Sequence, residues 1–451
     1  MNVMWRELLL PDFGIPEEAP VIPIDILEAR CRRAYGAAGC DWFAVYGDRE
    51  HFANLHYLTG FDPRFEEALL LMGPDGRKYL LVGNECIEYA VTVRIEISLV
   101  LCQPFSLPGQ DRTRSPKLSD ILREVGLTRG QTVGICGWKY TAHPELREHE
   151  ALHAPAILIH SVASAIGGTD GIKDVTQVLM DASDGLRAYS EVDQIAVNEW
   201  AAARASSALH RVVKGTRPGA SEMQAVSSMQ YAGEPLSVHI MYASGQDDIV
   251  GLRSPSSRKV EAGDAVFSAI GYWGGLSARG GLVDTDNSSF LDKWAIPYYR
   301  GIAAWYGAAS IGVTGGDIYA IVSEELARGG MKPALNPGHL IGADEWVNSF
   351  FAPGNPTKIA SGMAVQCDII PTPMAKGIVL NCEDSVVFAD EALREQLKSK
   401  YPAVWSRIQA RQQFVRNEIG IALSDDLLPL SNTPAYYAPL FLSPGHALAL
   451  G

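Results

Sequence analysis

Apolar positions in the first part of the chain alternate between helical and strand spacing. A helical stripe is formed by Leu27, Cys31, Ala34, Tyr35 and Ala38. The stretch "DWFAVYG" that follows has strand character, and "EALLLMGPDGRKYLLVG" holds two apolar runs around Pro74, Asp75 and Gly76, which predicts a hairpin. A helix is predicted across "KLSDILREVG" and a strand at "QTVGICGW". The alternation predicts an α/β domain over residues 1–186.

The pattern changes near residue 186, where a second domain is predicted to begin. An alanine-rich amphipathic helix is predicted to start after Ser190 as its N-cap and to end at Gly215, and Ser221 is predicted to cap the next helix. Glycine-rich strands and helices then mix, which predicts a domain over residues 187–390. Residues 391–451 are predicted to form a charged helix and a proline-containing tail.

The composition is that of a globular chain and excludes several classes of partner. With 451 residues, 47% hydrophobic and 20% charged, the chain is long enough for two or three domains with their own cores. The net charge of -14 and the lack of a long Lys/Arg run disfavour nucleic acid. No apolar run reaches the roughly 20 residues that span a bilayer, and the N-terminal stretch lacks the pattern of a signal peptide. We therefore expect a cytoplasmic protein with no membrane partner.

The seven cysteines carry no sign of a metal knot or a disulfide framework. They are odd in number and are scattered without CxxC spacing. We interpret them as buried, reduced thiols.

Two histidines need separate interpretations. In "NPGHLIGADEWVNSFF", Pro337 and Gly338 predict a sharp turn that points the ring of His339 into a cleft wall. Locally it can be either a core histidine with both nitrogens bonded to backbone or a site residue. His239, in "LSVHIMYASG", alternates with apolar neighbours on a predicted strand, and we interpret it as a packed core histidine.

Further stretches join the His339 loop in a fixed order. They are "RKVEAGDAVFSAIGYWGGLSARG" (258–280), "SGMAVQCDIIP" (361–371) and "GIVLNCEDSVVF" (377–388). In this order and spacing they resemble the pita-bread family of aminopeptidase P, prolidase, methionine aminopeptidase and creatinase. "NLHYLTGF" with the hairpin after it, and the "SEVDQI" helix, are similar to other parts of that family. The resemblance implies an α+β protein, with an N-terminal creatinase-like α/β domain before a C-terminal pita-bread domain.

The peptidases of this family hold a pair of divalent metals with two aspartates, a histidine and two glutamates. Carried over position by position, these ligands fall on Ala269, on Arg279 or Ala278, on His339, on Asp368 and on Glu383. An alanine with an arginine cannot supply the carboxylates that offset two metal ions, so we predict no dinuclear centre, no metal and no other cofactor. Asp284 and Asp286 are alternative ligands if the register is shifted, and otherwise solvated turn carboxylates.

Arginine is expected to take over part of the metals' role. The guanidinium of Arg279 is predicted to lie against Asp368 and Glu383 as a permanent cation, and the alternative is a surface arginine in the glycine-rich turn "SARGG". The family has two loop histidines at positions where this chain has Arg253 or a neighbour in "GLRSP", and Trp346, seven residues after His339. We therefore predict that Arg253, Arg279 and Trp346 bind substrate.

Three functions remain open for this site. The preferred one is a creatinase-like hydrolase that cleaves a C–N bond in a guanidino, amidino or cyclic amide substrate without a dinuclear centre, with His339, Asp368 and Glu383 as catalytic residues and His339 transferring protons. The second is a catalytically silent binding module. The third is a peptidase or lyase with one ion on the same three residues, ranked last because Arg279 would repel the ion. The resemblance also implies a homodimer.

Overall fold

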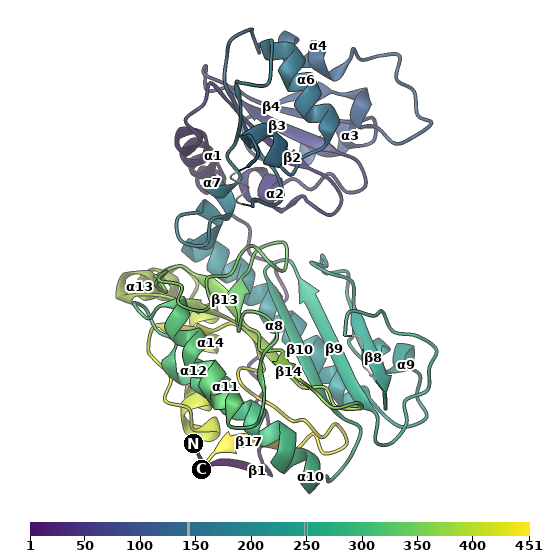
Figure 1. Ribbon diagram of the computed structural model, residues 1–451, viewed down its shortest axis with the longest axis vertical. Coiled ribbons are helices and arrows are strands. Elements are labelled where there is room, and N and C mark those ends of the chain that lie inside the picture. The colour runs from purple at the N-terminus through teal and green to yellow at the C-terminus, as the bar shows by residue number, and fades with distance from the viewer. Residues whose placement is uncertain (142–144, 248, 250) are drawn as a thin grey trace. The chain divides into compact units, whose positions relative to one another are not determined.

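The computed structural model describes residues 1–141, 145–247, 249 and 251–451. The chain forms two compact units, Ile22–Ala188 and a second unit made of Met1–Val21 together with Tyr189–Gly451. Residues 1–21 join the second unit because β1 (Val3–Glu7) pairs antiparallel with β17 (His446–Leu450), which brings both ends of the chain together (Figure 1). The division therefore differs from the predicted domains 1–186, 187–390 and 391–451, since the first strand and the last segment both belong to the second unit.

The first unit is built on a six-stranded sheet with the order β5-β4-β3-β2-β6-β7. Its strands are β2 (Trp42–Gly47), β3 (Ala68–Met72), β4 (Lys78–Val82), β5 (Ser98–Leu101), β6 (Val133–Cys136) and β7 (Ile172–Asp174). Strands β3 and β4 form the predicted antiparallel hairpin, and Gly76 in its turn has φ of +76°, a conformation that glycine adopts without strain. Parallel pairs extend the sheet at both ends.

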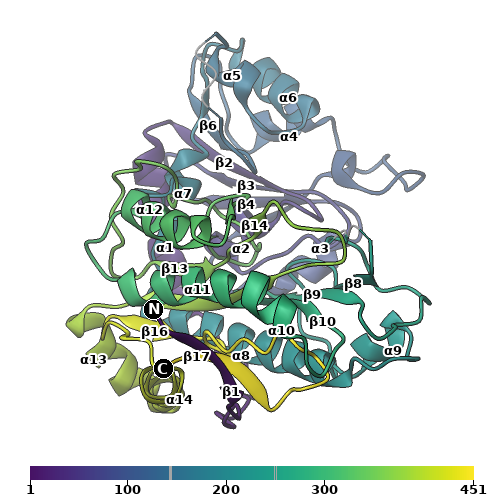
Figure 2. The same cartoon turned by 60° about the horizontal axis from the view of Figure 1, so that its bottom comes forward.

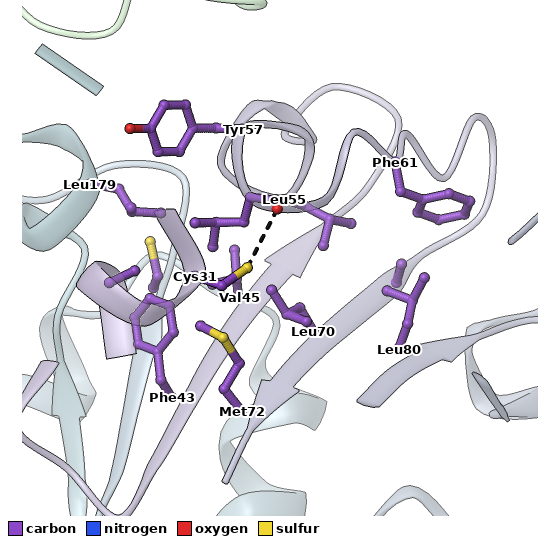
Figure 3. Packing of buried hydrophobic residues seen from close by; sticks show 14 of the residues in the cluster. Cys31, Phe43, Val45, Leu55, Tyr57, Phe61, Leu70, Met72, Leu80 and Leu179 are labelled. Carbon is purple, nitrogen blue, oxygen red and sulfur yellow. Dashed lines mark hydrogen bonds between the residues drawn. The ribbon is translucent and has the colours of Figure 1, made fainter. Parts of the chain in front are cut away.

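Helices cover this sheet and bury both of its faces. They are α1 (Ile24–Ala38), α2 (Ala53–Thr59), α3 (Cys86–Tyr89), α4 (Leu118–Glu124), α5 (Glu148–Ala151), α6 (Ala156–Ile166) and α7 (Gln177–Met180). Phe43 and Val45 of β2 pack with Leu55 and Leu179 in one apolar cluster (Figure 3). Trp42, on the opposite face, belongs to a second cluster. The predicted α/β alternation is confirmed.

The second unit contains the larger antiparallel sheet, with the order β12-β13-β15-β10-β9-β8 and β16 beside β15. Its strands are β8 (Met241–Gly245), β9 (Ala265–Tyr272), β10 (Gly275–Leu282), β12 (His339–Leu340), β13 (Ala364–Cys367), β15 (Asn381–Phe388) and β16 (Leu427–Pro429). A small separate ladder joins β11 (Lys332–Pro333) to β14 (Pro371–Thr372).

The long helix α8 (Val192–Gly215) runs along one face of β9 and β10 (Figure 2). Its small residues permit a close approach, since a Cβ on Gly275 would lie 2.7 Å from the Cα of Ala202. Glu191, and not Ser190, flanks its start. The other helices are α9 (Glu222–Ser227), which Ser221 caps as predicted, α10 (Ser288–Phe290), α11 (Ile296–Ala308), α12 (Gly315–Ala327), α13 (Glu391–Lys400) and α14 (Pro402–Phe414).

Two local predictions are wrong in this unit. The charged segment after residue 390 forms two helices, α13 and α14, because Pro402 lacks the N–H that would continue the first and instead begins the second. His239 is not a core strand residue. It is exposed in a loop, where its Nε2 lies 2.8 Å from the carbonyl oxygen of Leu252.

The length and hydropathy of the helices and the state of the cysteines are as follows. Within the described residues, none of the helices combines the length and apolar character needed to cross a bilayer. All seven cysteines are free thiols, and all but Cys40 are buried.

Candidate functional site

The pairing of three strands decides which side chains share a face of the large sheet. Ala278 of β10 lies opposite Glu383 of β15 and opposite Ala269 of β9. Residues that are directly opposite in antiparallel strands point to the same face, and successive residues alternate between faces. Ala269, Ala278 and Glu383 therefore share one face. Helix α8 covers the other, against Val266 and Ile270.

Two further candidates join Glu383 on its face. His339 of β12 lies opposite Gln366, and Gln366 lies opposite Ser385, two positions along the strand from Glu383. Asp368 follows the end of β13, whose Cys367 opposes Asp384, so alternation places Asp368 on the same face as Glu383. The predicted catalytic residues thus come from three neighbouring strands.

His339 is fully buried, and its two nitrogens have different surroundings. Nδ1 lies 3.2 Å from the backbone oxygen of Leu340. Nε2 lies 3.4 Å from Oε1 of Glu345 and 3.7 Å from Oε1 of Glu383. The ring of Trp346 stacks on the imidazole, with centroids 4.1 Å apart. Nε2 of His339 and Oε1 of Glu383 are both buried without a hydrogen-bond partner, so the two atoms face one another without a normal contact.

The electrostatics of this cluster follow from burial and from the mutual approach of charges. Burial opposes a charged imidazole, but Glu345 and Glu383 outweigh it and raise the pKa of His339 to about 10. Burial raises the pKa of Glu383 well above its ordinary value, and the charge of Asp368 adds to this. Burial also raises the pKa of Asp368, to about 6. The site therefore favours a positive charge between Nε2 and the carboxylates.

A second pair of polar groups lies beside the first. Asn381 is two positions before Glu383 on β15, on the same face, and its Nδ2 donates to Oδ1 of Asp368 over 3.3 Å. The Oδ1 of Asn381 is buried without a hydrogen-bond partner.

Solved structures of other proteins share this architecture. The Xaa-Pro dipeptidase from Bacillus anthracis is 18% identical and has a TM-score of 0.60 over 82% of this chain and 96% of that one. The prolidase from Pyrococcus horikoshii OT3 is 16% identical, with a TM-score of 0.62 over 79% and 95%. The X-Pro aminopeptidase from Thermotoga maritima MSB8 is 15% identical, with a TM-score of 0.63 over 81% and 95%. The chain has the pita-bread fold. No family model and no curated protein matches the sequence.

The pita-bread resemblance implies a dinuclear metal centre, and the residues present do not fit one. Ala269 and Ala278 occupy the face of the sheet where the two aspartates are expected, and they pack with Met241 and Leu276 in an apolar cluster. Methyl groups cannot bridge two cations, so the prediction of a missing dinuclear centre is consistent with this donor set. The strand pairing places Ala278, and not Arg279, opposite Glu383.

The residues do fit a single ion. His339, Glu345 and Glu383 each offer one ligand atom, and these atoms lie within 4.8 Å of one another. Metal ligands of this kind bind at about 2.0 to 2.2 Å, which separates neighbouring ligand atoms of a tetrahedral site by about 3.3 to 3.6 Å. The Nε2 distances of 3.4 Å and 3.7 Å are close to this range, and are longer than a charged hydrogen bond.

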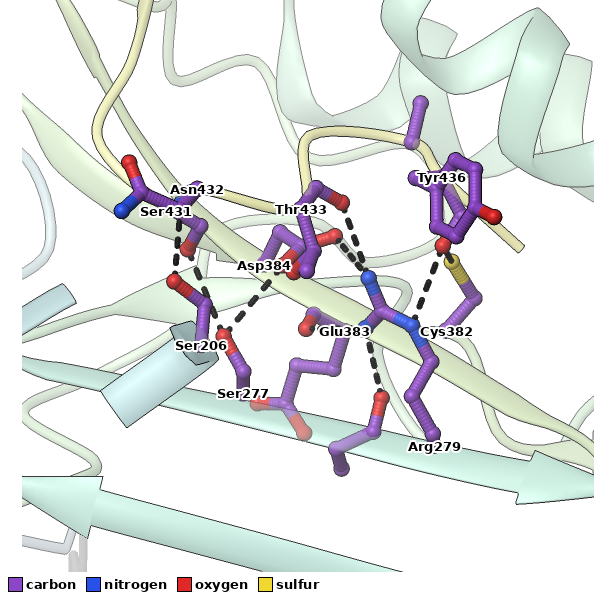
Figure 4. A network of polar contacts seen from close by, with 12 residues as sticks. Ser206, Ser277, Arg279, Cys382, Glu383, Asp384, Ser431, Asn432, Thr433 and Tyr436 are labelled. Atoms are coloured by element: carbon purple, nitrogen blue, oxygen red, sulfur yellow. Dashed lines mark hydrogen bonds and ion pairs between the residues drawn. The ribbon is translucent and has the colours of Figure 1, made fainter. Parts of the chain in front are cut away.

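The predicted role of Arg279 is wrong. The guanidinium donates to the carboxylate of Asp384 at 2.7 Å and to the backbone oxygens of Thr433 and Tyr436 (Figure 4). Because Arg279 follows Ala278 on the strand, its side chain lies on the α8 face, away from the carboxylate of Glu383, whose backbone oxygen alone it contacts. The positive charge that was expected to repel an ion is therefore absent from that face.

Arg253 and Trp346 also take up defined positions. Arg253 lies beside β8, where its backbone oxygen accepts from Tyr242 and its half-exposed guanidinium lies 3.8 Å from Glu222. Strand β8 is at the opposite end of the sheet order from β12 and His339. Trp346 covers the His339 ring and is 38% exposed. The substrate-binding roles of both residues stay predictions, and the position of Arg253 gives its role no support.

The shifted-register alternatives are not part of this cluster. Asp284 accepts a hydrogen bond from the backbone N–H of Thr285, and Asp286 is exposed. Both are turn carboxylates.

The sequence interpretation missed Glu345 and Asn381. Glu345 reaches His339 because the chain turns back on itself, so that Leu340 exchanges backbone hydrogen bonds with Val347 and Asn348. A spacing of six residues in a loop has no regular period that would reveal this. Asn381 had a usable signal, since it lies two positions before Glu383 on a predicted strand and must share its face.

Proposed function

We propose that this protein hydrolyses a C–N bond in a small polar substrate, using one divalent ion held by His339, Glu345 and Glu383. The observation that carries the proposal is a pair of buried atoms without a hydrogen-bond partner, Nε2 of His339 and Oε1 of Glu383, which face one another with Glu345 beside them. Buried polar atoms are nearly always satisfied, so such a pair indicates a missing cation.

Three features support a metal ion as that cation. The spacing of the ligand atoms agrees with a coordination sphere, as described above. Nδ1 of His339 is held against the Leu340 carbonyl, the arrangement by which metal-binding histidines commonly fix their tautomer. The position of Arg279 on the opposite face removes the reason for ranking a single ion last. The set replaces Asp368 of the sequence hypothesis with Glu345.

The reaction class is supported by the similar structures, which are named as Xaa-Pro peptidases and thus act on a C–N bond. A divalent ion supplies a Lewis acid and a bound water of lowered pKa. Trp346 holds the His339 ring in place by stacking. Asp368 and Asn381, beside the ligands, orient the substrate. Small guanidino, amidino and cyclic amide compounds remain the substrates to test.

The metal-free, creatinase-like hydrolase of the sequence analysis is the second candidate. One observation favours it, namely that Glu345 and Glu383 together stabilise a protonated His339 and raise its pKa to about 10. A proton then takes the place of the ion, and His339 is the proton-transfer group, acting first as an acid. Asp368 and Glu383 are then the other two catalytic residues, as the sequence analysis predicts.

Elemental analysis of protein purified without chelator separates the candidates. We expect about one divalent ion per chain in the parent and in His160→Gln, an exposed histidine in α6 that serves as the matched control, and none in His339→Gln. Turnover is then measured with the three protein preparations on the substrate series. A parent that turns over substrate without bound metal would establish the second candidate. A parent with neither metal nor turnover would favour a binding module.

A further inference from the structure

The oxygen of the Asn381 side chain is a hydrogen-bond acceptor that the proposed reaction does not yet use. Asn381 is 3% exposed, and its Oδ1 has no partner. Its orientation follows from its neighbour, because the carboxylate of Asp368 can only accept and therefore faces Nδ2. Oδ1 is left free.

The buried carboxylate of Asp368 also has unused hydrogen-bond acceptor capacity. It is 6% exposed, and Asn381, a neutral group, is its hydrogen-bond donor. No lysine or arginine forms an ion pair with Asp368 among the residues that the structure describes, and His339 is the titratable base whose charge acts on it. A buried carboxylate is normally paired with a cation.

The free groups beside the proposed ion are therefore all acceptors. Oδ1 of Asn381 needs a donor, and the Asp368 carboxylate accepts further donors and favours positive charge. Hydroxyl groups and water can donate, but a planar N–C–N group places two N–H donors side by side and carries the charge that Asp368 favours. Asn381 and Asp368 are adjacent, which suits such a pair of donors.

We infer that Asn381 and Asp368 form a subsite for an amidinium or guanidinium group of the substrate, with Asn381 as a specificity-determining residue. The inference rests on the proposed function, since it names the substrate class of that same site. Each N–H of the substrate group donates to one member of the pair, Oδ1 of Asn381 or a carboxylate oxygen of Asp368. The neighbouring ligands His339, Glu345 and Glu383 then hold the reacting C–N bond close to the proposed ion.

The test compares two cations of similar size that differ in their donors. Acetamidinium carries N–H groups, whereas tetramethylammonium carries the same charge and no N–H. Binding of each is measured by calorimetry and thermal shift on the protein as purified. We expect acetamidinium to bind at least about 10-fold more tightly, because a hydrogen bond to a charged group is worth about that factor. Equal affinities for the two cations would overturn the inference without any variant being made.

Variants then assign the preference to Asn381. Asn381→Leu keeps the volume and removes the acceptor, so acetamidinium should bind about 10-fold more weakly while tetramethylammonium is unaffected. Asn417→Leu, at an exposed asparagine, is the matched control and should bind both cations as the parent does. Acetamidinium binding by a folded Asn381→Leu that equals the parent would show that Asn381 has no such role.

The same samples separate the inference from the function on which it rests. The metal content of Asn381→Leu should equal that of the parent, because Asn381 is not among the proposed ligands. A parent that binds metal and turns over substrate but shows no preference for acetamidinium over tetramethylammonium would reject the subsite alone. A parent that binds acetamidinium selectively but holds no metal and turns over no substrate would reject the proposed function and keep the subsite.

Discussion

Two faces of the same strand pair, β10 and β15, carry opposite kinds of polar chemistry. On the α8 face, Arg279 and Asp384 form an ion pair, and Thr433 and Ser277 donate to the same carboxylate. On the other face, one residue along each strand, Ala278 lies opposite Glu383, whose Oε1 has no partner. We call the first face the bonded face, because its charged groups are hydrogen-bonded to one another. We call the second the open face, because its buried Glu383 Oε1 lacks a hydrogen-bond partner.

The difference indicates that the charges of Arg279 and Asp384 stabilise the fold, whereas the charge of Glu383 is available to a ligand. Arg279 donates hydrogen bonds to the backbone oxygens of Thr433 and Tyr436 and so attaches that segment to the sheet. Around Glu383, two buried acceptors, Oε1 of Glu383 and Oδ1 of Asn381, have no hydrogen-bond donor among the described residues. A buried charge with all its partners holds a fold together, whereas one that lacks them indicates a ligand.

The largest effect is expected from breaking the bonded face. Arg279→Ala leaves Asp384 buried without its cation, which should reduce the free energy of unfolding by about 3 to 5 kcal/mol. Burial already raises the pKa of Asp384, and loss of Arg279 raises it further. A carboxyl group with a raised folded-state pKa loses stability as the pH rises above its unfolded value of about 3.9, so the loss should be greater at neutral than at acidic pH.

Urea unfolding at several pH values measures this change. Arg253→Ala is the control, because its half-exposed ion pair should contribute less than about 1 kcal/mol. Unfolding of Arg279→Ala at the parental urea concentration would mean that the bonded face contributes nothing to stability.

The next effect comes from placing a carboxylate on the open face. Ala278→Asp restores an acidic side chain opposite Glu383, at a position that is fully buried. Without metal it should lower stability by about 3 kcal/mol, since a buried charge gains no partner. Manganese or zinc ions should restore part of this loss by binding only the folded state.

Thermal unfolding with and without metal tests the restored carboxylate. Ala269→Asp, opposite Ala278 on the same face, serves as a second variant with an added carboxylate. Ser277→Asp is not used, because Ser277 donates a hydrogen bond to Asp384. A metal-dependent rise in Tm no larger than that of the parent would show that this face cannot take a second ion.

A smaller effect is expected from removing a ligand. At 100 times its Kd, an ion that binds only the native state stabilises the parent by about 2.7 kcal/mol. His339→Gln should lose this stabilisation while folding normally, because glutamine keeps the hydrogen-bonding capacity of the ring. A full metal response in His339→Gln, measured by thermal shift against His160→Gln, would remove His339 from the proposed ligands.

The smallest effect concerns the aromatic cover of the open face. Trp346→Leu removes a ring stacked at 4.1 Å on His339, and it should lower stability by about 0.5 to 1.5 kcal/mol. Because the ring also fixes the imidazole, metal affinity should fall in the same variant. Calorimetry with zinc measures this, and unchanged affinity would limit Trp346 to a packing role.

The features of the fold that could be predicted from sequence are those that a few neighbouring residues determine. The hairpin at Gly76, the cap at Ser221 and the ordered motifs each depend on a few neighbouring residues, and the structure confirms them. Pro402 was an equally local signal for a helix break and was overlooked. The pairing of residues 3–7 with residues 446–450 had no local signal, because it joins segments more than 400 residues apart.

The candidate site was harder to predict, because it depends on which residues of each strand point to the same face of the sheet. A shift of one residue between Ala278 and Arg279 moves a side chain to the opposite face of the sheet, and sequence spacing alone left both possible. His339, Asp368 and Glu383 were predicted because they lie in recognisable motifs, and the strand pairing places them on one face of the sheet. Glu345 depends on a loop that turns back, and only the pairing of Leu340 with Val347 and Asn348 reveals it.

The pairing of β1 with β17 affects the time at which the second unit can finish folding. Residues 3–7 are synthesised before their partner strand at residues 446–450, which follows roughly 20 to 90 s later at typical rates of translation. During that interval β1 has exposed backbone donors and acceptors on its pairing edge. Residues 22–188, in contrast, contain every strand of their six-stranded sheet and can fold while the rest of the chain is still being made.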